Sequence, residues 1–243
     1  MSIKIWIVAL GLAVCLLVQH AVAGQTEDGV AAYNRGNYVT ALKLMQPLAA
    51  HGNAFAQSFL ARMYYKGLGV PQDYAKAMKW YRLAAAQGNR AAQFSLGFMF
   101  YKGQGTPQDY AGAMKWFQLA AAQSYARAQS FLGRMYYAGQ SAPQDYAKAM
   151  QWYRLAATQG DPSAQYSLGV MFSKGQGMPQ DYVQAYMWLG LASVAYPASD
   201  TTHRNKTAKL HGLVSAKMTP VQIAKAQRLT KIWLLAHPKL SKP

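Results

Sequence analysis

The tetrapeptide Pro-Gln-Asp-Tyr begins at Pro71, Pro107, Pro143 and Pro179 of this 243-residue chain, so each copy starts 36 residues after the previous one. No insertion or deletion interrupts the period. A fixed period of this length is typical of repeat architectures, in which each unit is one supersecondary element that packs on its neighbours. The sequence therefore predicts a repeat array, which presents extended surface to partners instead of closing around a catalytic pocket.

The first half of each unit reads as an amphipathic helix, which we call helix A. In the unit at residues 53–88, small or apolar side chains recur at helical spacing at Ala56, Leu60, Met63 and Tyr64. A glycine ends this stretch in every unit, because glycine readily adopts the left-handed conformation that closes a helix. These glycines are Gly67, Gly103, Gly139 and Gly175.

The second half reads as another helix, helix B, which begins at the tyrosine of the tetrapeptide. The aspartate before this tyrosine can cap the first free backbone N–H groups, and the proline prevents continuation from the preceding segment. Large rings such as Trp80 alternate with alanines, which favours close packing in a core. Gly88 and Gly160 close two of the units, and Ser124 stands at the equivalent place between them. A less regular turn is therefore expected at Ser124.

One run of residues can be followed through all four units. The run A-Q-x-x-L-G-x-M-x-x-K-G-x-G-x-P-Q-D-Y-x-x-A-x-x-W-x-x-x-A occupies residues 92–120 and recurs with small changes between residues 53 and 196. It resembles the Sel-1-like repeat, a relative of the tetratricopeptide repeat, and the segment from Tyr33 to Ala41 resembles a degenerate preceding unit. The resemblance implies an all-α, right-handed α-solenoid of antiparallel helix pairs. It also implies a non-catalytic protein–protein interaction adaptor or scaffold, often at the bacterial envelope.

The amino-terminal residues have the pattern of an export signal. A positive start precedes an apolar run over residues 5–18, and the Ala-Val-Ala sequence that ends at Ala23 fits the small-x-small cleavage pattern. The run is short for a membrane span, so we expect a cleaved signal and no later transmembrane segment; a retained anchor is the alternative. Cleavage would remove Cys15, the only cysteine, which excludes disulfides. The mature protein is expected to be periplasmic or secreted.

The expected organisation follows from the signal and the period. It comprises a signal peptide (1–23), a degenerate amino-terminal repeat or cap (24–52), repeats 1 to 4 (53–88, 89–124, 125–160 and 161–196) and basic carboxyl-terminal capping helices (197–243).

The carboxyl-terminal segment carries much of the chain's formal charge of +17, and no acidic residue follows Asp200. Within it, residues 219–236 read as a closing helix, in which Thr219 and Pro220 form the start. The expected buried stripe comprises Ile223, Ala226, Leu229, Ile232 and Trp233, and the expected solvated side carries the basic residues Lys225, Arg228 and Lys231.

Two interpretations of this basic tail remain open. It is either a solvated capping surface or a binder of an envelope polyanion, such as lipid headgroups, acidic polysaccharide or cell-wall polymer. Nucleic acid is not an expected partner of an exported protein.

The repeats alternate in type. Repeat 1 shares 27 of 36 residues with repeat 3 but 23 with its direct neighbour, repeat 2. If helix A lines the concave side, the alternation falls on an inward stripe, where arginine-containing patches alternate with aromatic ones. The stripe comprises Ser58, Arg62, Tyr65, Phe94, Phe98, Tyr101, Ser130, Arg134, Tyr137 and Tyr166.

Arginine with tyrosine suits carboxylates or phosphates, and an aromatic patch suits apolar side chains or sugar faces. The stripe is therefore a predicted groove for a protein partner, with an anionic or aromatic-stacking envelope polymer (peptidoglycan or polysaccharide) as the alternative. The other interpretation is that the phenylalanines belong to the core and the arginines are merely solvated.

Catalytic and cofactor chemistry has no candidate residues. The histidines show no metal-ligand spacing, and the acids occur mostly as isolated capping aspartates one repeat apart. The Gly-x-Gly at Gly103 lacks the preceding strand of a phosphate loop, and helix capping already accounts for it. We therefore expect no enzyme activity, no metal and no cofactor.

Overall fold

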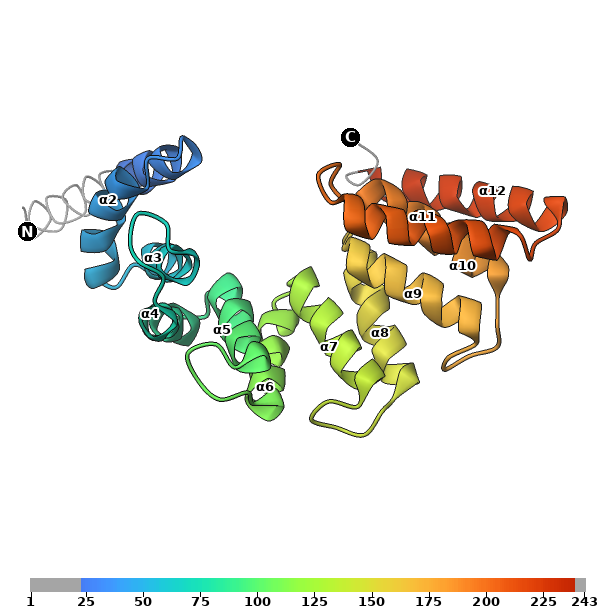
Figure 1. Ribbon diagram of the computed structural model, residues 1–243, viewed down its shortest axis with the longest axis horizontal. Coiled ribbons are helices and arrows are strands. Elements are labelled where there is room, and N and C mark those ends of the chain that lie inside the picture. The colour runs from blue at the N-terminus through green and yellow to red at the C-terminus, as the bar shows by residue number, and fades with distance from the viewer. Residues whose placement is uncertain (1–22, 239–243) are drawn as a thin grey trace, which may run out of the picture. The chain divides into compact units, whose positions relative to one another are not determined.

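The computed structural model describes residues 23–238, and this part of the chain contains helices and no strand (Figure 1). The predicted signal peptide, apart from its last residue, lies outside the described residues. Residues 23–34 are helical. The helices that follow are α2 (Tyr38–Ala50), α3 (Ala54–Lys66), α4 (Tyr74–Ala86), α5 (Arg90–Lys102), α6 (Tyr110–Ala122), α7 (Ala126–Ala138), α8 (Tyr146–Ala157), α9 (Pro162–Lys174), α10 (Tyr182–Ala195), α11 (Thr201–Ser215) and α12 (Pro220–Ala236).

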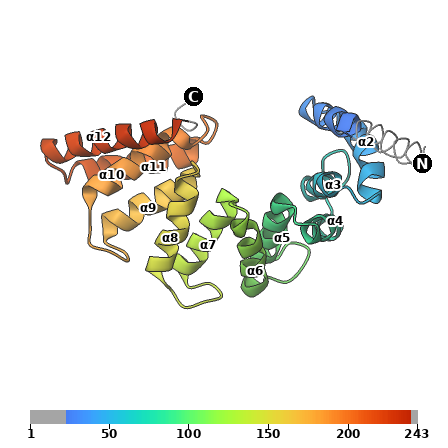
Figure 2. The ribbon, with the colours of Figure 1, turned by 180° about the vertical axis from the view of Figure 1, so that it is seen from behind.

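The chain divides into two compact units, Met1–Asp109 and Tyr110–Pro243. In the first unit α3 packs on α4, and α2 and α5 pack on the outer sides of that pair. In the second unit α7 pairs with α8 and α9 pairs with α10. Both α11 and α12 then pack on α10, an arrangement that the two opposite views show (Figures 1 and 2). The fold is an all-α solenoid of repeated helix pairs, as predicted.

The turns between helix A and helix B have the predicted caps. The glycine after each helix A has left-handed torsions, for example φ 68° and ψ 39° at Gly67 and φ 67° and ψ 36° at Gly175. Each helix B begins at the tyrosine of the tetrapeptide. The side chains of Asp73, Asp145 and Asp181 each accept a hydrogen bond from the backbone N–H three residues on. The boundaries of the helix pairs are therefore set by local sequence.

The core repeats with the same period. Helix A buries a leucine and a methionine at the same two places in every repeat, each with no more than 1% of its surface exposed. These pairs are Leu60 and Met63, Leu96 and Met99, Leu132 and Met135, and Leu168 and Met171. Side chains of one size at one depth let each repeat present the same surface to the next, which is what close packing requires.

A buried glutamine in each helix A links that helix to the preceding helix. The side-chain amides of Gln57, Gln93, Gln129 and Gln165 each donate to the backbone carbonyl eight residues earlier, at 3.1–3.3 Å. A second glutamine, thirty residues on, donates to the buried one in repeats 1 and 3: Gln87 to Gln57 at 2.8 Å and Gln159 to Gln129 at 2.6 Å. This arrangement was not anticipated from the sequence.

The series of glutamines ends imperfectly in repeat 4. Residue 195, thirty after Gln165, is alanine, and the buried Oε1 of Gln165 has no hydrogen-bond partner among the described residues. A buried acceptor without a partner costs free energy, so Gln165 is less well satisfied than its counterparts Gln57 and Gln129.

The expectation of a less regular turn at Ser124 is wrong. Ser124 adopts φ 56°, in the same left-handed region as Gly88 and Gly160 at φ 82° and 85°. Its backbone N–H bonds to the Ala121 carbonyl at 2.9 Å, compared with 3.0 Å for the equivalent bond of each glycine. The turn is therefore kept, and the serine takes a conformation that disfavours residues with a Cβ atom.

The predicted closing helix is present as α12, with a capping box formed by Thr219 and Gln222. Trp233 meets Trp188 of α10 edge to face at 5.8 Å, and Ala226 is fully buried. One expected core residue is misplaced, because Ile232 is 52% exposed. It lies about 100° around the helix from Trp233, since successive residues turn by that angle.

Candidate functional site

In the first unit, Arg62 of the predicted stripe is exposed and held over aromatic rings. Its guanidinium lies 4.4 Å from the centre of the Tyr33 ring and 5.4 Å from that of Phe59. Those two rings meet edge to face at 5.1 Å, and Phe55 beside them is 48% exposed. We call Tyr33, Phe55, Phe59 and Arg62 the Arg62 cluster.

The Arg62 cluster leaves the guanidinium available to a ligand. No ion pair within residues 23–238 involves Arg62. Stacking on aromatic rings restricts the side chain, and a restricted guanidinium loses less conformational freedom when it makes a bidentate contact with a carboxylate. Sequence reasoning selected Arg62 but missed the rings, because Tyr33 belongs to the degenerate unit before repeat 1.

The second unit has a related arrangement at the equivalent residue of repeat 3. Arg134 is exposed, and its guanidinium lies 6.0 Å from the centre of the Phe131 ring. Arg127 stands where repeat 1 has Phe55, seventy-two residues earlier. Arg62 and Arg134 therefore each lie near a phenylalanine of their own helix, although the other surrounding side chains differ.

The remaining stripe residues of the first unit are less accessible. Phe94 and Tyr101 are buried, at 6% and 5% exposure, whereas Ser58 and Phe98 are half-buried. The Tyr65 hydroxyl donates to Oε1 of Gln104 at 2.9 Å. Burial raises the pKa of the Tyr65 hydroxyl above its ordinary value. This hydroxyl fastens the loop after α5 and is not free for a ligand.

Stripe residues of the second unit follow the same pattern. The Tyr137 hydroxyl donates to Oε1 of Gln176 at 2.9 Å, which repeats the Tyr65 contact seventy-two residues later. The Lys206 ammonium of α11 lies 5.2 Å from the centre of the Tyr166 ring. The predicted stripe is therefore partly structural, and its exposed cations are Arg62 and Arg134.

Ser130, also in the predicted stripe, is buried at 7% exposure and serves the cap of α9. Burial raises the pKa of Asp161, the capping residue of that helix. Hydrogen bonds to its carboxylate from the Ala164 backbone and from Ser130 oppose the shift. Ser130 thus contributes to the turn before α9 and presents little surface to a partner.

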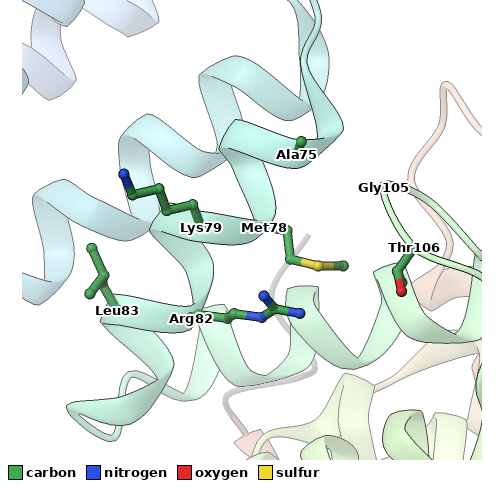
Figure 3. Close-up of a pocket in the computed structure, with 7 residues that line it drawn as sticks. All are labelled: Ala75, Met78, Lys79, Arg82, Leu83, Gly105 and Thr106. Atoms are coloured by element: carbon green, nitrogen blue, oxygen red, sulfur yellow. The ribbon is translucent and has the colours of Figure 1, made fainter.

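A shallow hollow on α4 in the first unit was not predicted. It has a volume of about 400 Å³ and is lined by Ala75, Met78, Lys79, Arg82, Leu83, Gly105 and Thr106. Figure 3 shows Arg82 extending below Met78 toward the side of Thr106, whereas Lys79 points away. The lining has two cations and no acid, so it offers positive potential but no pair of groups for acid–base chemistry.

The basic residues of the tail, Lys225, Arg228 and Lys231, are all exposed on α12. Within residues 23–238, no cluster of three or more histidine, cysteine, aspartate or glutamate side chains could hold a metal ion. In the same range, every helix is too short or too polar to cross a membrane.

Fold and sequence together define the class of protein, an α-solenoid built from repeated helix pairs. The sequence profile of the Sel1 repeat matches residues 54–89, 90–125, 126–161 and 162–193, which is more than half of the chain. The chain therefore belongs to the Sel1 repeat family. Sel1 repeat proteins are generally protein-interaction scaffolds, and their fold is typically non-catalytic.

Solved structures show the same fold. A Sel1 repeat protein from Oxalobacter formigenes is 26% identical, with a TM-score of 0.68 over 87% of this chain and 99% of that one. A Sel1 repeat protein from Klebsiella pneumoniae subsp. pneumoniae is 22% identical, with a TM-score of 0.52 over 80% and 93% of the two chains. An immunity protein from Pseudomonas aeruginosa is 18% identical, with a TM-score of 0.52 over 88% and 82%. No curated protein sequence matches the chain.

Proposed function

We propose that this chain is a non-catalytic adaptor of the bacterial cell envelope that binds a protein partner through the predicted stripe on the A helices. The observation that carries the proposal is the Arg62 cluster, in which an exposed guanidinium without an ion pair among the described residues lies 4.4 Å above a tyrosine ring. Arginine and aromatic side chains are enriched among the residues that dominate binding energy at protein interfaces.

The partner segment would combine a carboxylate with an apolar or aromatic side chain. The carboxylate would pair with Arg62, and the apolar group would cover the exposed Phe55 ring. Arg134 and Phe131 would make a similar contact in the second unit. Neither contact requires a reaction, a metal or a cofactor.

The test compares two double variants of the protein. Replacement of Arg62 and Arg134 by alanine is expected to weaken partner binding by at least about 30-fold, because a single truncation at an interface hot spot already costs about 2 kcal/mol or more. The matched control replaces Arg82 and Arg154 by alanine, which removes the same charge from exposed helix-B positions of the same two repeats. A partner isolated from envelope extract would be measured against both variants by calorimetry. Equal binding by both would reject the stripe as the binding surface.

The envelope location rests on the predicted signal peptide and has its own test. Edman sequencing of the protein from a periplasmic fraction is expected to begin at Gly24. A chain recovered with Met1 intact and only in the cytosol would overturn the envelope role while leaving partner binding open.

The alternative function is binding of an envelope polymer such as peptidoglycan or an anionic polysaccharide. It is favoured by one observation, the exposed cations of α12 in a tail without acidic residues after Asp200. Sedimentation with cell-wall sacculi would support it only if binding weakens as salt rises, since exposed charges are screened.

A further inference from the structure

The outer side of α12 is not purely polar, contrary to what a closing helix requires. Val221, Ile232 and Leu235 are 79%, 52% and 72% exposed. With about 100° per residue, residues 221, 225, 228, 232 and 235 fall within a sector of about 80°, so these aliphatic side chains share one stripe with Lys225 and Arg228. We call these five residues the α12 stripe.

The α12 stripe lies opposite the side of the helix that packs on α10. Ala226 is fully buried and Trp233 contacts Trp188, and both lie on the other half of the helical wheel. The stripe extends over about 21 Å, because its ends are fourteen residues apart along the helix. Along the stripe, Lys225 and Arg228 lie between Val221 and the pair Ile232 and Leu235, so the surface combines exposed aliphatic side chains with cations. Large aliphatic side chains exposed on one side of a helix are typical of an interaction site.

A second copy of the chain would cover this surface poorly. An isologous contact would bring Lys225 and Arg228 toward the same cations of the other copy. No acidic residue follows Asp200, so α11 and α12 offer no counter-charge. The last residues, 239–243, are no better suited, because they add Lys239 and Lys242.

A polyanion without an apolar interior would also leave part of the surface unused. It would pair with Lys225, Arg228 and the flanking Lys231 but would leave Val221, Ile232 and Leu235 in water. The surface of an anionic bilayer can accommodate both the cations and the aliphatic side chains of the α12 stripe. Aliphatic side chains can enter the boundary with the acyl chains while lysine and arginine extend their charged ends to the phosphates.

We propose that α12 docks on an anionic lipid surface through the α12 stripe, with its axis in the plane of the membrane. The docking does not depend on the proposed partner-binding stripe, which lies on the A helices. Attraction would come from Lys225, Arg228 and Lys231, and insertion of the three aliphatic side chains would give the contact its preference for a bilayer over other polyanions.

The experiment measures sedimentation with vesicles of equal parts phosphatidylglycerol and phosphatidylcholine. The protein is purified from the cells that produce it, so its amino terminus is processed naturally, and every variant has the same terminus. Replacing Lys225, Arg228 and Lys231 by glutamine is expected to lower the vesicle affinity by roughly 100-fold, at about 1 kcal/mol per cation. The control replaces Lys79, Arg82 and Lys115 by glutamine, which removes the same charge from α4 and α6, and is expected to bind like the parent.

A second variant separates the lipid from other anions. Replacing Ile232 and Leu235 by serine keeps every charge and is expected to lower vesicle affinity by roughly tenfold, because apolar burial contributes to interfacial binding. Normal affinity in this variant would overturn the bilayer proposal in favour of a charge-only polyanion contact. An equal loss in the α4 and α6 control would show that net charge alone is responsible.

Two further outcomes would also overturn the proposal. Equal binding to pure phosphatidylcholine vesicles would remove the requirement for anionic lipid. A dimer of the parent that the Ile232→Ser and Leu235→Ser changes dissociate, measured by light scattering, would assign the stripe to a second copy. Thermal melts confirm that each variant is folded before it is compared.

Discussion

Repeats 1 and 2 share several internal hydrogen bonds with repeats 3 and 4, whereas the two ends of the array are built differently. The contact between Tyr65 and Gln104 recurs between Tyr137 and Gln176 with the same 2.9 Å distance. At one end, by contrast, Arg62 stacks on Tyr33, and at the other Trp233 covers Trp188. The repeats are thus held by a common set of contacts, and the two ends are held by contacts that do not recur in the array.

Among changes to the ends and to the repeats, removal of the carboxyl-terminal helices should have the largest effect on stability. A chain that stops at Asp200 lacks α11 and α12, so Trp188, now 7% exposed, would lose its cover. We expect the free energy of unfolding to fall by about 3–5 kcal/mol, because a large buried apolar surface becomes exposed, and the shortened chain to aggregate. Thermal melts and light scattering measure both effects.

The tail's charges provide the control for this truncation. Replacing Lys225, Arg228 and Lys231 by glutamine should change the free energy of unfolding by less than about 0.5 kcal/mol, as is usual for exposed positions. A truncated chain that remains monomeric and melts with the parent would show that the end of the array is stable without its closing helices.

The loops after helix A offer a sharper comparison between equivalent positions. Gly177 adopts φ 79°, and a Cβ atom there would lie 2.9 Å from Cβ of Tyr146. At the equivalent place of repeat 3 the chain has Ser141, at φ 68°. Gly177→Ala should destabilise the protein by about 1–2 kcal/mol, because it combines a left-handed backbone with a steric clash.

The reverse change, Ser141→Gly, should stabilise the protein by about 0.5–1 kcal/mol through relief of the left-handed strain. Both values come from urea unfolding curves of the two variants. A destabilised Ser141→Gly variant would mean that the serine side chain contributes more to the native loop than its backbone strain costs.

The glutamine series should give the smallest effect. Gln129→Leu removes the donor to the Ala121 carbonyl and the acceptor of Gln159. Gln165→Leu removes only the bond to Ala157, since its Oε1 is unpartnered. We expect the first change to cost about 0.5 kcal/mol more than the second, because it removes one more hydrogen bond, although the Gln159 amide keeps its bond to the Leu155 carbonyl at 3.1 Å.

Ala195→Gln is the complementary change, and it is expected to raise the free energy of unfolding by about 0.5 kcal/mol by supplying the missing donor to Gln165, at the low end of the usual range for one hydrogen bond. Equal costs for the two leucine variants in urea unfolding would indicate that the second glutamine contact has no energetic value.

The local features of the fold could be predicted from the sequence because they depend on residues a few positions apart. The left-handed glycine at Gly67, the cap at Asp73 and the start of each helix B are decided by backbone sterics and by hydrogen bonds over three residues. The period of 36 residues then required that whatever held one unit would recur in the next, so the array of helix pairs followed from the printed sequence.

Only the tertiary structure decided which side chains are accessible. Phe94 and Arg62 belong to the same predicted stripe, yet one is buried and the other is exposed over Tyr33. Ile232 has the spacing of a core residue but lies outside the contact with α10, because the angle at which a helix docks selects which part of its apolar surface is covered. The period and the composition determine which side chains share one side of a helix. The packing of helices that are distant in sequence determines whether solvent or another molecule can reach that side.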